Sequence, residues 1–157
     1  RDQVHRGADD NASGVAGMLE IAQYLCDEVQ QGRLKLKANL MFAAWSGEEL
    51  GLLGSAYFID HPPAVVRDDS DPHAVLLDPH AEMPPRKVSA CFNLDMIGRL
   101  RDKLVLQGTG SSPVWKSEIE KRNSIVGLPL ILQDDSYLPT DASSFYSAGV
   151  PILSAFT

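Results

Sequence analysis

The chain has 157 residues, a formal net charge of −7, 44% hydrophobic residues and 22% charged residues. These values are typical of one globular domain, which we expect to span 1–157. The acidic balance argues against a nucleic-acid partner, because a phosphate backbone requires a basic surface. No stretch reaches the roughly 18 consecutive apolar residues of a membrane span, so no membrane partner is expected.

The two cysteines, Cys26 and Cys91, lie in apolar segments with a helical and a strand pattern. We therefore expect two buried free thiols rather than a disulfide, and their number does not fix the compartment. No signal peptide is recognisable. Because the chain begins within a motif and ends on an apolar strand, it is expected to belong to a longer protein.

The first predicted element is a long helix. Apolar residues recur at helical spacing and predict a helix over about 12–30, with Asn11 or Ser13 as its N-cap. Its apolar face consists of Val15, Met18, Leu19, Ala22, Leu25, Cys26 and Val29. Acids before a helix are ordinarily explained by the helix dipole. Here Asp9 and Asp10, together with Asn11 and flanking glycines, exceed what a cap requires.

Two adjacent glutamates, Glu48 and Glu49, form the most unusual feature of the sequence. The apolar run 38–45 predicts a buried strand, and 50–59 predicts the helix behind it. The glutamates would then lie at the carboxyl end of a strand, where open α/β sheets bind ligands. Two carboxylates in a partly dry cleft need a cation or a proton between them, although the helix dipole alone also favours acids there.

Residues 61–86 change in character, because prolines and acidic residues interrupt any long element. We expect a solvated loop or insertion here. Its histidines are interpreted as loop residues rather than metal ligands; they are His61, His73 and His80.

The rest of the chain alternates strands and helices. Strands are predicted at 88–94, 103–107, 128–132 and 152–156, the second of them paired with the first as a hairpin. Helices are predicted at 113–126 and 142–147, the second capped by Thr140 and Asp141. This alternation predicts an α/β fold: a three-layer sandwich with a mostly parallel or mixed central sheet flanked by helices.

Acidic residues recur at equivalent places in this topology: Asp10 at a helix start, Glu48 and Glu49 after a strand, and Asp95 at the end of another strand. Parallel strand ends lie along one rim of a sheet, so we expect these carboxylates to converge. Repulsion between two carboxylates ~4 Å apart is about 4 kcal/mol at an effective dielectric constant of 20, and divalent cations remove it. Carboxylates alone suit Mg²⁺ or Ca²⁺, whereas zinc normally requires nitrogen as well.

Four motifs occur in order: Gly-Ala-Asp-Asp-Asn-Ala-Ser-Gly at 7–14, Trp-Ser-Gly-Glu-Glu-Leu-Gly-Leu-Leu-Gly-Ser at 45–55, Asn-Leu-Asp-Met-Ile-Gly-Arg at 93–99 and Thr-Asp-Ala-Ser-Ser-Phe-Tyr-Ser-Ala-Gly-Val-Pro at 140–151. Together they resemble the signatures of the M28 zinc peptidases, in that family's order. The resemblance covers nearly the whole chain apart from 61–86 and implies a zinc-exopeptidase-like catalytic domain.

This resemblance implies a role for each acidic residue. Asp10 matches the aspartate that bridges two zinc ions, Glu49 a ligand of one zinc, and Asp95 a ligand of the other. Glu48 matches the general base that takes a proton from the bridging water. The family often has a cis peptide bond after the bridging aspartate, so the Asp10–Asn11 bond is expected to be cis.

The family's two zinc-ligand histidines have no match. One precedes the first motif in a His-x-Asp pattern, and the chain starts too late to contain it; His5 does not fit that pattern and is interpreted as a loop residue. The other follows the last strand, beyond Thr157. The chain therefore carries the oxygen ligands of a dizinc site without its nitrogen ligands, and weakened zinc binding is expected.

The implied function is that of a metal-dependent aminopeptidase, whose partner is a peptide with a free N-terminus. Two alternatives stay open: an inactive fragment or structural domain of the same fold, and a glutaminyl-cyclase-like transferase with one zinc. Members of the family are commonly exported, so the resemblance favours a secreted or periplasmic location.

Overall fold

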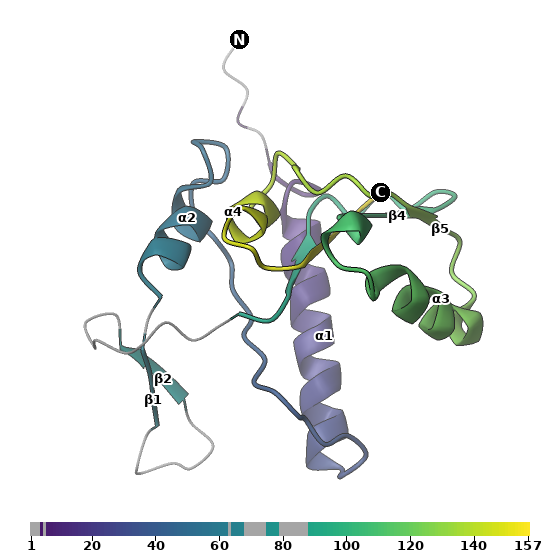
Figure 1. Ribbon diagram of the computed structural model, residues 1–157, viewed down its shortest axis with the longest axis horizontal. Coiled ribbons are helices and arrows are strands. Elements are labelled where there is room, and N and C mark those ends of the chain that lie inside the picture. Colours follow the sequence, from purple (N-terminus) through teal and green to yellow (C-terminus); the bar gives the residue numbers. More distant parts are fainter. Residues whose placement is uncertain (1–3, 5, 63, 68–74, 79–87) are drawn as a thin grey trace.

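A mixed four-stranded sheet forms the centre of the computed structural model, which describes residues 4, 6–62, 64–67, 75–78 and 88–157 (Figure 1). Its strands are β3 (Cys91–Leu94), β4 (Leu104–Gln107), β5 (Leu130–Leu132) and β6 (Ile152–Phe156), in the order β3-β6-β4-β5. β6 is parallel to β3 and antiparallel to β4, whereas β4 is parallel to β5. The predicted α/β class with a mixed central sheet is confirmed.

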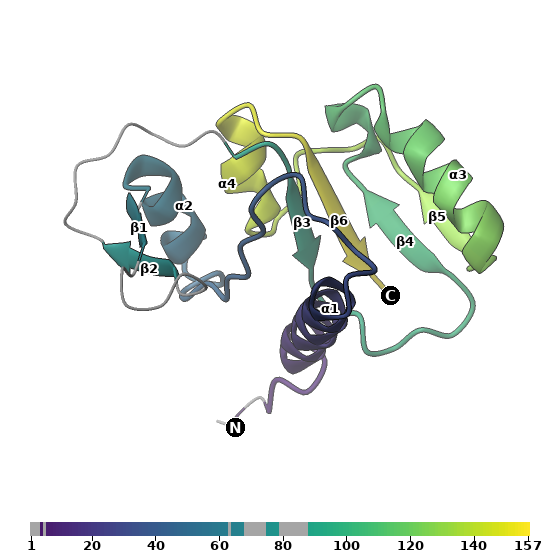
Figure 2. The ribbon, with the colours of Figure 1, turned by 90° about the horizontal axis from the view of Figure 1, so that it is seen from below.

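Helices cover both faces of this sheet (Figure 2). The helical elements are α1 (Ala12–Gln30), α2 (Leu53–Asp60), the 3₁₀ turn η1 (Thr109–Ser111), α3 (Trp115–Val126) and α4 (Ala142–Ser147). Of these, α1 packs on β3 and α4 on β3 and β6, whereas α2 packs on α4. Gly17 of α1 approaches the Leu94 side chain, whereas Cys91 packs against the cluster around α4. Because side chains alternate between the two faces along a strand and Cys91 and Leu94 are three residues apart on β3, their side chains point to opposite faces. Thus α1 and α4 lie on the two sides of the sheet.

The buried core lies between β6 and α4. Its members are Leu138, Ala142, Phe145, Val150 and the fully buried Ile152. Trp45 extends this core, with its ring centroid 5.0 Å from that of Phe58 in α2 and 5.9 Å from that of Phe145 in α4. The segment that leads into the two glutamates is therefore fixed to the core through Trp45.

Helix α1 has the predicted bounds, and its predicted N-cap is confirmed because Asn11 Oδ1 accepts a hydrogen bond from Gly14 N at 3.0 Å. The predicted apolar face is only partly covered: Leu19 keeps 60% of its surface exposed, and Cys26 is exposed. The prediction of a buried thiol is therefore wrong for Cys26. The reason is that the C-terminal half of α1 extends beyond the strands (Figure 1).

Two strand predictions are wrong. The apolar run 38–45 is not a strand, and Leu40, Met41 and Phe42 keep 49%, 48% and 43% of their surface exposed. Hydrophobicity favours burial, but a strand also needs a backbone partner, and none of the described strands pairs with this run. The predicted hairpin between 88–94 and 103–107 is also wrong, because β6 lies between β3 and β4.

The predicted loop at 61–86 contains an antiparallel pair, β1 (Ala64–Arg67) and β2 (Val75–Asp78), which lies apart from the four-stranded sheet (Figures 1 and 2). The expectation of a loop is therefore wrong for these residues, which pair with each other rather than with the sheet, while the expectation of an insertion stays a prediction. His73 and His80 lie outside the described residues. In the described part of the chain, no helix combines the length and apolarity needed to cross a membrane.

Candidate metal centre

Asp10 lies in the turn that begins α1, and its side chain is exposed. The Asp10–Asn11 peptide bond is cis, as expected. The turn is closed by a hydrogen bond from Ala12 N to Gly7 O at 2.9 Å, and Gly7 has a left-handed φ of 63°. Asp10 is therefore presented by a hydrogen-bonded turn and not by the end of a strand.

Glu48 and Glu49 lie in a tight turn, not at the start of a helix. Leu52 N donates to Glu48 O at 2.9 Å, and α2 begins only at Leu53. The turn packs closely on α2, since a Cβ at Gly54 would lie 2.8 Å from the backbone N and O of Ser46. This close approach requires glycine and fixes the turn; Glu48 is half-buried in it and Glu49 is exposed.

Asp95 is the one predicted ligand that directly follows a strand. Its backbone N–H donates to Ala155 O at 3.1 Å, which continues the pairing of β3 with β6. The side chain is half-buried. Met96 then takes a left-handed φ of 54°, which turns the chain away from the sheet.

The predicted carboxylates lie near enough to one another for their charges to interact. Burial raises the pKa of Glu48, and the charges of Glu49, Asp141, Asp95 and Asp10 raise it further. Burial likewise raises the pKa of Asp95, followed by charges that include Asp10, Asp141 and Glu49. We call these five residues the acidic cluster. Like charges in a partly buried site are relieved by a proton or a cation.

Asp141 was not predicted as a site residue. It occupies the N-cap position of α4 but its side chain makes no capping hydrogen bond, so the predicted capping role is wrong. Its Oδ1 atom is buried and has no hydrogen-bond partner among the described residues. A buried carboxylate oxygen without a donor is costly. The sequence feature that could have identified Asp141 as a site residue is its place in the fourth motif, at 140–151.

Cys91, at the start of β3, lies close enough to Asp141 for the charge of that carboxylate to act on it. Burial raises the pKa of its thiol to about 12, with a further contribution from the charge of Asp141. In the metal-free chain, Cys91 therefore stays protonated. The ligands predicted for this site are carboxylate oxygens of the acidic cluster.

The carboxylate oxygens of the acidic cluster are suitable ligands for a divalent cation, but they do not form a complete coordination shell. In the described parts of the chain, no three His, Cys, Asp or Glu side chains converge as a group that could hold a metal ion. His61, the one histidine in those parts, is exposed and stacks on Tyr57 with ring centroids 4.4 Å apart. His5 lies outside the described residues. The unpartnered Asp141 oxygen and the mutual repulsion of the cluster support a cation, while zinc requires nitrogen in addition.

Fold and cluster together define an α/β domain with carboxylates suited to a divalent cation. A family model described as Peptidase family M28 matches residues 2–157. The chain therefore belongs to peptidase family M28.

Individual relatives agree with this assignment. The chain is 27% identical to leupeptin-inactivating enzyme 1 of Streptomyces exfoliatus, over 99% of this chain and 31% of that protein. It is 30% identical to leucine aminopeptidase 2 of Trichophyton equinum, over 96% of this chain and 28% of that protein. Among solved structures, BSAP, a zinc aminopeptidase from Bacillus subtilis, matches with a TM-score of 0.67 and 26% identity, over 99% of this chain and 34% of that one. The chain thus spans about a third of the length of these relatives.

Proposed function

We propose that the protein is a metal-dependent aminopeptidase that removes the N-terminal residue from peptides with a free N-terminus. The observation that carries this proposal is that carboxylates from distant segments act on Glu48: the charges of Glu49, Asp95 and Asp10 all raise its pKa. These are the residues that the family motifs single out. The relatives named above as aminopeptidases support the same reaction.

In this proposal, Asp10, Glu49 and Asp95 would hold two zinc ions, together with histidines of the family pattern. The chemistry supplied there would be that of a Lewis acid, which polarises a carbonyl and makes water a better acid. The exposed carboxylates of Asp10 and Glu49 are accessible to an arriving ion. The half-buried carboxylate of Asp95 is held at the end of β3 by the hydrogen bond from its own N–H to Ala155 O.

Glu48 is proposed as the general base. It accepts a proton from the attacking water and passes that proton to the departing amine. In the metal-free chain its pKa is raised by burial and by neighbouring carboxylates, and cations on those carboxylates would offset the second of these effects. Its half-buried position in a tight turn restricts the directions in which the carboxylate can point.

The test compares the full-length protein with its Glu48→Gln variant on leucine p-nitroanilide, with Glu120→Gln on the exposed surface of α3 as the matched control. General-base catalysis typically contributes 10²–10⁴-fold, so Glu48→Gln is expected to lower kcat by about this factor. A chelator should abolish wild-type turnover, and zinc should restore it. Turnover of Glu48→Gln within tenfold of wild type eliminates the assigned base.

The same preparations separate the alternatives. Cyclisation of a peptide with an N-terminal glutamine, without release of leucine from the reporter, supports a glutaminyl-cyclase-like transferase. A purified protein that holds no zinc and releases no leucine supports a structural domain of the same fold. Two tightly held zinc equivalents with leucine release support the proposed aminopeptidase.

A further inference from the structure

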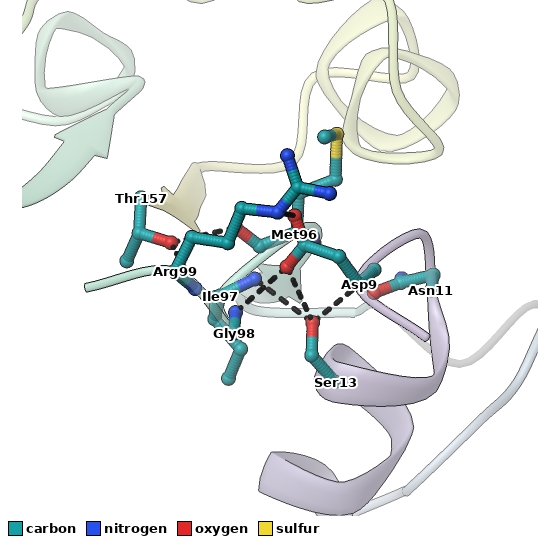
Figure 3. A network of polar contacts seen from close by, with 8 residues as sticks. All are labelled: Asp9, Asn11, Ser13, Met96, Ile97, Gly98, Arg99 and Thr157. Carbon is teal, nitrogen blue, oxygen red and sulfur yellow. Dashed lines mark hydrogen bonds and ion pairs between the residues drawn. The ribbon is translucent and has the colours of Figure 1, made fainter. Parts of the chain in front are cut away.

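The loops that carry Asp10 and Asp95 are joined by a dense set of polar contacts around Asp9 (Figure 3). Asp9 Oδ1 accepts a hydrogen bond from Gly98 N at 3.0 Å, and Asp9 Oδ2 lies 2.9 Å from Arg99 Nε. Ser13 Oγ donates to Asp9 O at 2.6 Å. We call the pair formed by Asp9 and Arg99 the anchor.

Asn11 and Ser13 add contacts on both flanks of Asp95. Asn11 Nδ2 donates to Leu94 O at 2.9 Å, and Asn11 Oδ1 accepts from Met96 N at 3.3 Å. Ser13 Oγ accepts from Ile97 N at 3.0 Å. The residues on either side of Asp10 therefore hold the residues that surround Asp95 (Figure 3).

The side chains of Asp10 and Asp95 take no part in this network. Across the described residues, neither carboxylate appears in a side-chain hydrogen bond or an ion pair. The contacts thus fix the two backbones and leave the two carboxylates uncommitted. This is the arrangement expected of groups that orient metal ligands without being ligands themselves.

The charges of the anchor are unevenly exposed. The Asp9 side chain is 11% exposed and the Arg99 side chain 70% exposed. Asp9 Oδ2 has no well-aligned hydrogen bond, so its pairing with Arg99 Nε is mainly a charge interaction. Asp9 also lies close enough to Asp95 for its charge to act on that carboxylate. Arg99 therefore offsets a negative charge beside the acidic cluster and holds it in place.

We propose that Asp9 and Arg99 are positioning residues of the site, and that their ion pair fixes the Asp10 loop against the Asp95 loop in the arrangement needed to bind a cation. This inference rests on the proposed metal site and adds two residues to it. It makes a prediction opposite to that of simple electrostatics. Removing a positive charge beside a cation site should strengthen cation binding, whereas removing a positioning residue should weaken it.

The experiment titrates the full chain with Co²⁺ and records both the affinity and the visible absorption spectrum. Arg99→Met is expected to bind Co²⁺ about 10–100-fold more weakly than wild type, the range seen when outer-shell residues are lost, and to show an altered spectrum. Arg99→Lys, which keeps the charge, should recover most of the affinity. Arg101→Met removes an exposed arginine two residues further on and should bind as tightly as wild type or more tightly.

Co²⁺ binding by Arg99→Met that equals or exceeds wild type, with an unchanged spectrum, overturns the inference. Failure of the wild type to take up Co²⁺ counts against the proposed function, and the anchor is then judged by amide hydrogen exchange. In that experiment Asp9→Asn and Asp9→Ala should speed exchange at Gly98 N–H, and Asp9→Ala should do so more because it removes the acceptor. Unchanged exchange at Gly98 in both variants overturns the anchor.

Discussion

Adding a methyl group at Gly14 is predicted to push α1 away from β3. Gly14 is buried, and a Cβ there would lie well within 3.0 Å of both Asn11 Oδ1 and Leu94 O. These two oxygens are acceptors in the contacts that cap α1 and join Asn11 to β3. Gly14→Ala therefore forces the cap and the strand apart.

The expected loss can be worked from these contacts. Overpacking costs about 1–3 kcal/mol, and loss of the Asn11 cap costs about 1 kcal/mol. Replacing glycine by alanine within a helix returns about 0.5–1 kcal/mol. The net loss in the free energy of unfolding is about 1–3 kcal/mol. For a protein of this size, Tm should fall by about 2–4 °C for each kcal/mol.

The assay is thermal and urea unfolding followed by circular dichroism for wild type, Gly14→Ala and Gly17→Ala. A Cβ at Gly17 would meet only side-chain atoms, Ile97 Cδ1 at 2.7 Å, Leu94 Cδ1 at 3.5 Å and Ile97 Cγ1 at 4.0 Å. Because the close contact is the end of a flexible side chain, Gly17→Ala should stay within about 1 kcal/mol of wild type. If Gly14→Ala unfolds at the same temperature and urea concentration as wild type, the close approach of Gly14 to Leu94 is refuted.

Three further predictions concern charge and packing. Burial and neighbouring charges raise the pKa of Glu48 and Asp95 above 4.5 and 3.8, so the folded, metal-free protein binds protons at a pH where the unfolded chain has released them. Its Tm in EDTA should therefore rise as the pH falls from neutral toward the ordinary pKa range of these carboxyl groups; a constant or falling Tm contradicts this. Asp141→Asn removes a repulsive charge, so it should raise Tm by a few degrees in EDTA yet weaken zinc binding by calorimetry, and equal zinc affinity would count against it. Ile152→Ala should cost about 2–5 kcal/mol in urea unfolding and Ile152→Val about 0.5–1.5; equal losses would contradict the buried position.

Local signals were sufficient for several elements. The helical spacing of apolar residues and the Asn11 cap predict α1 with its observed bounds, 12–30. The strand at 152–156 and the short helix at 142–147 also have the predicted bounds. In each case the information lies within the element or directly beside it, as turn residues or hydrophobic periodicity. Elements of this kind can be predicted from one sequence.

Predictions that depended on pairing between distant segments failed. The apolar run 38–45 reads as a strand by composition, but nothing in the run identifies a backbone partner. The segment 103–107 was correctly predicted as a strand, yet its neighbours β5 and β6 lie later in the chain than any local hairpin partner. Strand order is decided by which faces bury together, and one sequence does not record that choice.

For the site, too, local features were predictable and long-range contacts were not. The motifs supplied Asp10, Glu48, Glu49 and Asp95, with Asp10 expected at a helix start and the other three at strand ends. Asp10 does lie at a helix start and Asp95 at a strand end, whereas the glutamates lie in a turn with no strand before it. The contact between Asp9 and Gly98 spans 89 residues, and no feature of either local sequence indicates it. The residue types were therefore predictable, whereas the contacts that bring them together were not.

The glutamates reach the cluster without a strand because the core holds their turn from both sides. Trp45 packs on Phe58 and Phe145 before the turn. After the turn, the fully buried Ser55 of α2 places its Oγ 2.9 Å from that of Ser144 in α4. Helix α4 follows directly from Asp141, so the same packing places that carboxylate beside the glutamates. Glu48 therefore depends on the α2–α4 contact, whereas Asp10 depends on the anchor, and damage to one should leave the other carboxylate in place.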